Sequence, residues 1–105
     1  MQRTSISTVT LAGLSDMAQA RLEIQNIKGL HARASAKLAE VVEDFEGTAR
    51  VSKDGMDADG DSIMGLLMLA ATIGTFIEVE TSGPDADAMM QAITDLVNDK
   101  FGEGD

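Results

Sequence analysis

The chain is organised around residues 27–47, which read IKGLHARASAKLAEVVEDFEG. Its apolar side chains recur at helical intervals; they are Ala34, Leu38, Val41, Val42 and Phe45. This spacing places them on one face of an α-helix. Gly29 breaks the pattern before the helix, and we expect Gly47 to end it in the left-handed conformation. His31, the one histidine of the chain, therefore falls at or next to the helix N-cap.

A histidine at the start of a helix has two interpretations. The first N–H groups of a helix lack partners within it and carry the positive end of the helix dipole, so they attract anions. That positive end, together with Arg33, favours a neutral and nucleophilic ring, and it would stabilise a phosphoryl group on that ring. The alternative is a histidine that merely caps the helix. The spacing alone leaves both interpretations open.

The composition is that of one small acidic domain. The chain has 105 residues, 44% of them hydrophobic, which suffices for one core. It has no cysteine and one histidine, which leaves little for disulfides or zinc. A net charge of −10 argues against nucleic acid and anionic membranes as partners. No apolar run has the length of a membrane span or a signal peptide, so we expect a cytoplasmic protein.

The remaining pattern predicts an α+β fold. Residues 1–18 lack periodicity and are expected to form a flexible N-terminal extension before a domain at 19–105. Strands are predicted where apolar and polar residues alternate, at 20–26, 48–53, 56–59 and 76–81. Asp54-Gly55 predicts a hairpin turn between the second and third of them. Further helices are expected at 63–71 and from Pro84 until Lys100 and Gly102. The order β-α-β-β-α-β-α favours a mostly antiparallel four-stranded sheet with three helices covering one face.

The helix predicted at 63–71 has no charged residue and no polar face. A helix that is apolar all round must be fully buried or must expose apolar surface. A domain this small offers little room for full burial, although an unusually buried helix is the alternative. We expect some of its side chains to form an exposed patch for partner docking. The candidates are Ile63, Met64, Leu67 and Met68.

Two acidic motifs near residue 60 look functional but do not fit. Residues 55–62 have the glycine and serine spacing of a phosphate-binding loop, but Asp61 stands at the lysine position and would repel phosphate. Asp57, Asp59 and Asp61 have the spacing that opens a calcium loop, but Met68 stands where the bidentate glutamate belongs. We therefore expect these acids on the solvent face of a hairpin, and we assign no metal and no cofactor.

Two motifs, NIKGLHAR at 26–33 and SIMGLLML at 62–69, carry a family resemblance. At this separation they resemble the histidine-containing phosphocarrier proteins (HPr) of the bacterial phosphotransferase system, and the resemblance covers residues 19–102. It implies an open-faced β-sandwich that accepts a phosphoryl group from Enzyme I on Nδ1 of His31. The group would pass to a histidine of an Enzyme IIA protein. It further implies a monomeric carrier without metal or cofactor, rather than a stand-alone enzyme.

The resemblance also implies roles for individual residues. The phosphate-binding set comprises Asn26, Ala32, Arg33 and Ala34. Ser62 matches the serine that HPr kinase/phosphorylase modifies in many relatives, although Asp61 adds a negative charge directly before it. Many sugar-transport members have proline where this chain has Ala34, and the Ala34-Ser35 pair is more similar to the nitrogen-related, regulatory branch. The choice between sugar uptake and regulation stays open.

Two rival functions remain. One is a regulatory binding module that uses the Ile63–Met68 patch without phosphoryl relay; the presence of His31 weighs against it. The other is a small hydrolase, for which nothing in the sequence fixes a serine near His31. The sequence therefore favours the phosphocarrier.

Overall fold

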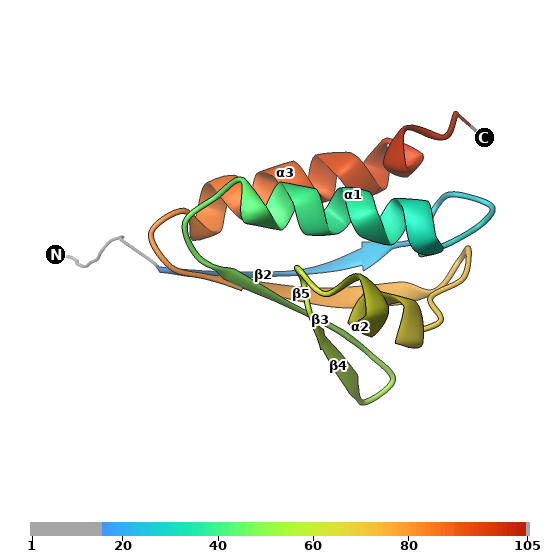
Figure 1. Cartoon of the computed structure of the whole chain (residues 1–105), viewed down its shortest axis with the longest axis horizontal. Helices are drawn as coiled ribbons and strands as arrows, with labels where there is room; N and C mark the ends of the chain where they lie inside the picture. Colours follow the sequence, from blue (N-terminus) through green and yellow to red (C-terminus); the bar gives the residue numbers. More distant parts are fainter. Residues whose placement is uncertain (1–15, 105) are drawn as a thin grey trace, which may run out of the picture.

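The computed structural model describes residues 16–104 (Figure 1). The strands are β2 (Met17–Glu23), β3 (Thr48–Lys53), β4 (Met56–Asp59) and β5 (Phe76–Ser82). The helices are α1 (Ala32–Glu43), α2 (Ile63–Met68), α3 (Ala86–Asn98) and the short 3-10 helix η1 (Lys100–Gly102). The predicted element order and α+β class are confirmed. The predicted flexible extension falls mostly on residues 1–15, which lie outside the described residues.

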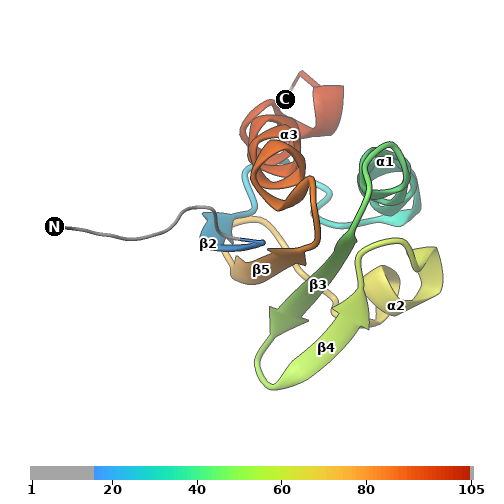
Figure 2. The same cartoon turned by 90° about the vertical axis from the view of Figure 1, so that its left-hand side faces the viewer.

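The sheet has the strand order β2-β5-β3-β4, and every neighbouring pair is antiparallel. Lys53 pairs with Met56 across the predicted hairpin turn. Asp54 and Gly55 in that turn have φ angles of 51° and 84°, the left-handed values that a tight two-residue turn requires. Figure 2 shows the three helices on one side of the twisted sheet, with the other face open. This is the predicted open-faced arrangement.

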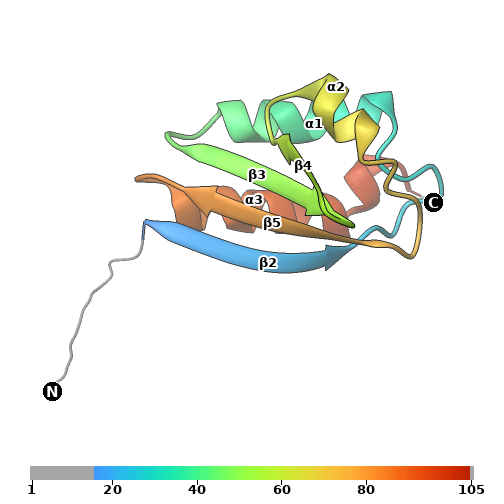
Figure 3. The same ribbon diagram turned by 90° about the horizontal axis from the view of Figure 1, so that it is seen from below.

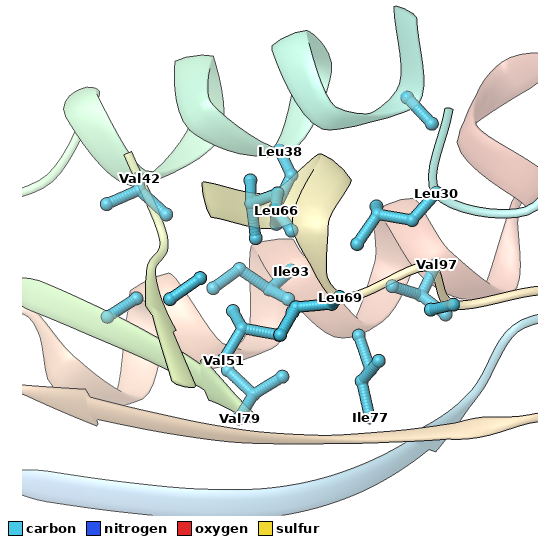
Figure 4. Close-up of a cluster of buried hydrophobic side chains, with 14 of the residues drawn as sticks. Leu30, Leu38, Val42, Val51, Leu66, Leu69, Ile77, Val79, Ile93 and Val97 are labelled. Atoms are coloured by element: carbon cyan, nitrogen blue, oxygen red, sulfur yellow. The ribbon is translucent and has the colours of Figure 1, made fainter. Parts of the chain in front are cut away.

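The core lies between the sheet and the helices (Figure 4). Alternate residues of β3 and β5 point inward, while α1 and α3 each contribute one apolar stripe. Fully or almost fully buried members include Leu38, Val51, Leu66, Ile77, Val79, Ile93 and Val97. Each such side chain contributes roughly 1.5–3 kcal/mol on burial, so this layer stabilises the relative positions of the helices and the sheet.

The first strand is shifted relative to the prediction of 20–26. β2 ends at Glu23, which pairs with Phe76, the first residue of β5. Ile24 is fully buried beyond the sheet, where it bonds through its backbone to Thr75 and Gly74. The alternation of apolar and polar residues continues to Ile24, so the sequence predicted a longer strand. Residues after Glu23 have no partner in β5, because Glu23 already pairs with the first residue of that antiparallel strand.

Two helices end earlier than predicted. α1 ends at Glu43, and Gly47 lies in the turn before β3 with a φ of +145°. A Cβ atom on Gly47 would lie 2.2 Å from the Ser82 carbonyl oxygen, so this glycine allows two segments to approach closely. α2 ends at Met68, because Ala70 takes a left-handed φ of 52° that interrupts the helix.

The last helix begins later than predicted. α3 starts at Ala86, whereas Pro84 lies in the preceding turn. Asp85 precedes the helix, and its carboxylate accepts a hydrogen bond of 2.8 Å from the Glu46 backbone N–H. Within residues 16–104, no helix combines the length and the apolar character that crossing a membrane requires.

Candidate functional site

His31 is the N-cap residue of α1. Its backbone is extended, with φ of −77° and ψ of −176°, and its carbonyl accepts the Ser35 N–H at 2.8 Å. The side chain makes no capping hydrogen bond. The imidazole ring is therefore not used to cap the helix, which leaves it available for chemistry.

The loop before α1 fixes where this ring stands. Leu30 donates its backbone N–H to the Ala71 carbonyl at 2.9 Å. Gly29 has a φ of +66°, and a Cβ atom there would lie 2.4 Å from the same oxygen. The start of α1 is thereby tied to the segment that leaves α2. Figure 3 shows the loop, α2 and the end of the chain together at one end of the molecule.

A carboxylate from the end of the chain reaches the ring. Glu103 Oε2 is bonded to His31 Nε2, and Glu103 Oε1 accepts from Asn26 Nδ2 at 3.0 Å. The hydrogen bonds to His31 first and Asn26 second hold the pKa of the Glu103 carboxyl below its ordinary value of 4.5. Burial opposes them, and the charges of a protonated His31 and of Arg33 add smaller effects in the same direction as the hydrogen bonds. Glu103 is therefore ionised at neutral pH.

This contact distinguishes the two ring nitrogens of His31. An ionised carboxylate can only accept hydrogen bonds, so Nε2 must carry a proton. In a neutral imidazole the other nitrogen, Nδ1, then holds the lone pair. No hydrogen bond to Nδ1 is seen within residues 16–104. The geometry thus leaves the free lone pair of a neutral ring on Nδ1.

Basic side chains gather beside the carboxylate. Lys28, Arg33 and Lys37 line a shallow pocket together with Gly102 and Glu103. They offset the acidic character of the protein at the end of the molecule where His31 stands. An anion approaching the ring therefore meets local positive charge despite the net charge of −10.

The four predicted phosphate-binding residues lie in two parts of the site, namely the first turn of α1 and the loop before it. Ala32, Arg33 and Ala34 form the first turn of α1, where backbone N–H groups have no partner within the helix. Asn26 is fully buried, and its amide donates to the Gly29 carbonyl at 2.8 Å as well as to Glu103. The structure thus brings three of the four residues to the ring end of α1, while Asn26 supports the loop and the carboxylate.

α2 exposes part of its apolar surface beside this site. Ile63, Met64 and Met68 are 40%, 70% and 66% exposed, whereas Leu66 is fully buried and Leu67 half-buried. The expectation that α2 cannot be wholly buried is confirmed. We call Ile63, Met64, Leu67 and Met68 the α2 patch. Ser62 caps this helix, and its Oγ accepts the Gly65 N–H at 3.0 Å.

Comparison with known proteins identifies the family. The family described as "PTS HPr component phosphorylation site" matches residues 18–99. The chain belongs to the HPr family. Its role is therefore that of a phosphocarrier in the phosphotransferase system.

Individual HPr proteins are similar over most of the chain. The phosphocarrier protein HPr of Neisseria meningitidis serogroup B is 48% identical over 89 residues, which are 85% of this chain and 100% of the relative. The phosphocarrier protein NPr of Escherichia coli K12 is 37% identical over 83 residues, 78% of this chain and 92% of the relative. The crystal structure of HPr-C-His from Thermoanaerobacter tengcongensis superposes with a TM-score of 0.79 at 32% identity and covers 82% and 97% of the two chains.

Two of the acidic residues whose spacing resembles that of a calcium loop lie close to an arginine in this HPr protein. Asp57 and Asp59 are exposed on β4 and lie 3.6 and 3.9 Å from the guanidinium nitrogens of Arg50. Asp57 and Asp59 occupy the solvent face of the hairpin, as predicted, whereas Asp61 is exposed in the turn that follows β4. Within residues 16–104, no group of three or more His, Cys, Asp and Glu side chains is placed to hold a metal ion.

Glu103 is the site residue that sequence reasoning missed. It stands 72 positions from His31 and outside any periodic segment. The only local signal is an acid between Gly102 and Gly104, and an acid flanked by glycines is common at a flexible chain end. The contact depends on how the chain turns after α3, which no local pattern encodes.

The cap of α2 leads to a stability prediction. Ser62→Ala removes the acceptor of the Gly65 N–H, so the free energy of unfolding is expected to fall by about 1 kcal/mol. Urea denaturation followed by circular dichroism measures this. Ser62→Asp keeps an N-cap acceptor and should stay close to wild type. Equal midpoints for Ser62→Ala and wild type would show that the cap contributes nothing.

Proposed function

We propose that this HPr protein accepts a phosphoryl group from Enzyme I on Nδ1 of His31 and passes it to a histidine of an Enzyme IIA protein, as a cytoplasmic monomer. The proposal is supported by the contact between His31 and Glu103. The one histidine of the chain has Nε2 bonded to an ionised carboxylate, which leaves Nδ1 as the nucleophile at the anion-attracting start of α1.

The transfer needs positioning and charge stabilisation. The lone pair of Nδ1 attacks phosphorus, and the bond from phosphorus to the donor nitrogen breaks with its electron pair on the donor. The negative charge on the phosphoryl oxygens is then stabilised by hydrogen bonds from the backbone N–H groups of Ala32 and Ala34 and by the positive guanidinium of Arg33. Because Arg33 is exposed on the first turn of α1, it can reach a group on the ring without rearrangement of the core.

A reconstituted relay tests this function. The purified chain is incubated with Enzyme I and phosphoenolpyruvate, and the phosphate is located by mass spectrometry. We expect an acid-labile, base-stable phosphate on His31 that disappears when a cognate Enzyme IIA protein is added. Absence of Enzyme I-dependent labelling would overturn the relay and leave a regulatory binding module as the function.

The α2 patch and Ser62 supply the proposed docking and regulation. The patch lies beside the site because the segment after α2 is bonded to the loop before His31. We propose that Enzyme I docks on this patch and that HPr kinase/phosphorylase phosphorylates Ser62. A phosphate there would sit on a helix N-terminus, so α2 need not melt. Its charge would instead act on partners at the neighbouring patch.

Charge at Ser62 is therefore expected to slow transfer from Enzyme I. Ser62→Asp adds a negative charge beside the α2 patch, and we expect a several-fold slower phosphorylation of His31 at low salt. The defect should shrink at high salt, because salt screens exposed charges. Initial rates at two ionic strengths measure this. Ser62→Asn, which is also a good N-cap but neutral, serves as the control. A wild-type rate for Ser62→Asp at low salt would rule the mechanism out.

A further inference from the structure

We propose that Glu103 is a positioning residue for phosphoryl transfer. Its carboxylate fixes the His31 ring with the proton on Nε2 and balances the charge that the ring gains when Nδ1 bonds phosphorus. This inference rests on the proposed function of His31, since it assigns a role to a group that touches the ring and not the phosphoryl group.

The segment that delivers Glu103 has an unusual backbone. Lys100 and Phe101 both have a φ of 55°, and Gly102 follows with a φ of 75°. Three consecutive residues thus lie in the left-handed region, which residues with a Cβ atom rarely adopt because of steric crowding. Such a conformation persists only where surrounding contacts hold it, and it is typical of functional sites.

Contacts of two kinds hold this left-handed turn. The Phe101 side chain is fully buried in the core, and its carbonyl accepts a 2.7 Å hydrogen bond from Lys37 Nζ on α1. The turn is also closed internally, because the Gly102 N–H donates to the Asp99 carbonyl at 2.9 Å and the Glu103 N–H donates to the Lys100 carbonyl at 3.0 Å. The turn is therefore held by both the core and α1, and this fixes the position of the Glu103 backbone.

Hydrogen bonds and burial also fix the position of the Glu103 carboxylate. Both of its oxygens have partners, one on His31 and one on Asn26, and its side chain is only 9% exposed. Asn26 is itself fully buried and bonded to the loop before α1. The carboxylate thus has one position and one orientation against the ring. This is the arrangement by which a carboxylate fixes the tautomer of a histidine.

The charge balance of the transfer explains what the carboxylate does. As Nδ1 forms its bond to phosphorus, the donor nitrogen leaves with the electron pair of the broken bond. The proton on Nε2 stays in place, so the phosphorylated ring carries a positive charge. Glu103 already faces that proton as an anion, and no reorganisation is needed when the charge appears. In the onward step the ring leaves phosphorus as a neutral imidazole with the same Nε2 proton.

Three variants test the role of Glu103. Glu103→Gln removes the charge at nearly constant shape, and Glu103→Asp keeps the charge on a shorter side chain. Glu43→Gln makes the same change at the exposed far end of α1, roughly 18 Å along the helix axis, and is the matched control. For each variant the tautomer of His31 is read from ¹⁵N NMR of the unphosphorylated protein. The rate of transfer is measured at saturating phosphorylated Enzyme I, with thermal unfolding as the check of folding.

We expect wild type and Glu43→Gln to show the Nε2-protonated tautomer and equal rates. Glu103→Gln should show a mixture of tautomers and a kcat lower by at least about tenfold, since mutating the outer partner of a metal-bound histidine costs roughly 10–100-fold in activity. Glu103→Asp should keep the tautomer and recover part of the rate. A Glu103→Gln protein with the wild-type tautomer and kcat would overturn the proposal. If the tautomer depends on Glu103 but even wild type accepts no phosphate from Enzyme I, the proposed function fails while the positioning of the ring stands.

Discussion

Replacing His31 by alanine is expected to abolish acceptance of a phosphoryl group from Enzyme I while the fold survives. The chain has no second histidine that could take over the group. The lost packing is limited, because the His31 side chain lies at the N-cap and does not belong to the apolar core. Loss of its hydrogen bond to the ionised Glu103 carboxylate should lower the free energy of unfolding by about 1.5–3 kcal/mol.

Mass spectrometry after incubation with Enzyme I and phosphoenolpyruvate measures the effect of His31→Ala. The control is Gln91→Ala, which also removes an exposed hydrogen-bonding side chain, on α3. It should be labelled to the wild-type extent. Full Enzyme I-dependent labelling of His31→Ala would contradict the assignment of the acceptor.

The second large effect is expected at the α2 patch. Met64 is 70% exposed, so Met64→Glu should be tolerated by the fold. A charge in the centre of an apolar docking surface must be desolvated or must displace the partner, and we expect the KM for this chain in transfer from Enzyme I to rise more than tenfold. A smaller effect on kcat is expected, because Met64 lies on α2 whereas the ring stands at the start of α1.

Met56→Glu is the matched control for this variant. Met56 is 47% exposed at the start of β4, next to the hairpin turn, and it does not belong to the α2 patch. The same substitution there should leave KM unchanged. Two results would argue against docking at α2: an unchanged KM for Met64→Glu, or unfolding of that variant, which would show that Met64 belongs to the core.

Local sequence signals were sufficient for the elements that form from local contacts. The apolar stripe of α1 and the Asp54-Gly55 turn each depend on residues only a few positions apart, and both were predicted correctly in kind. The position of His31 follows from the same pattern, because a helix start is marked by local spacing. The partial exposure of α2 could also be predicted, since its composition leaves no polar face to turn outward.

Features that depend on distant partners were not accessible from local sequence. β2 ends where its partner β5 begins, and the apolar Ile24 gave no sign of this. The end of α2 is set by the left-handed Ala70, although alanine is normally a strong helix former. Phe101 lies beyond α3, and the left-handed turn places its side chain in the core. Glu103 reaches His31 only because of that turn.

The position of the phosphate on the ring shows which nitrogen of His31 accepts the phosphoryl group. The ¹⁵N-labelled chain is phosphorylated with Enzyme I and phosphoenolpyruvate, and coupling between ³¹P and ¹⁵N identifies the nitrogen that carries phosphorus. Because Glu103 holds the proton on Nε2, we predict phosphorus on Nδ1 of His31 and a retained proton on Nε2. Phosphorus on Nε2, or on any other residue, would contradict this account.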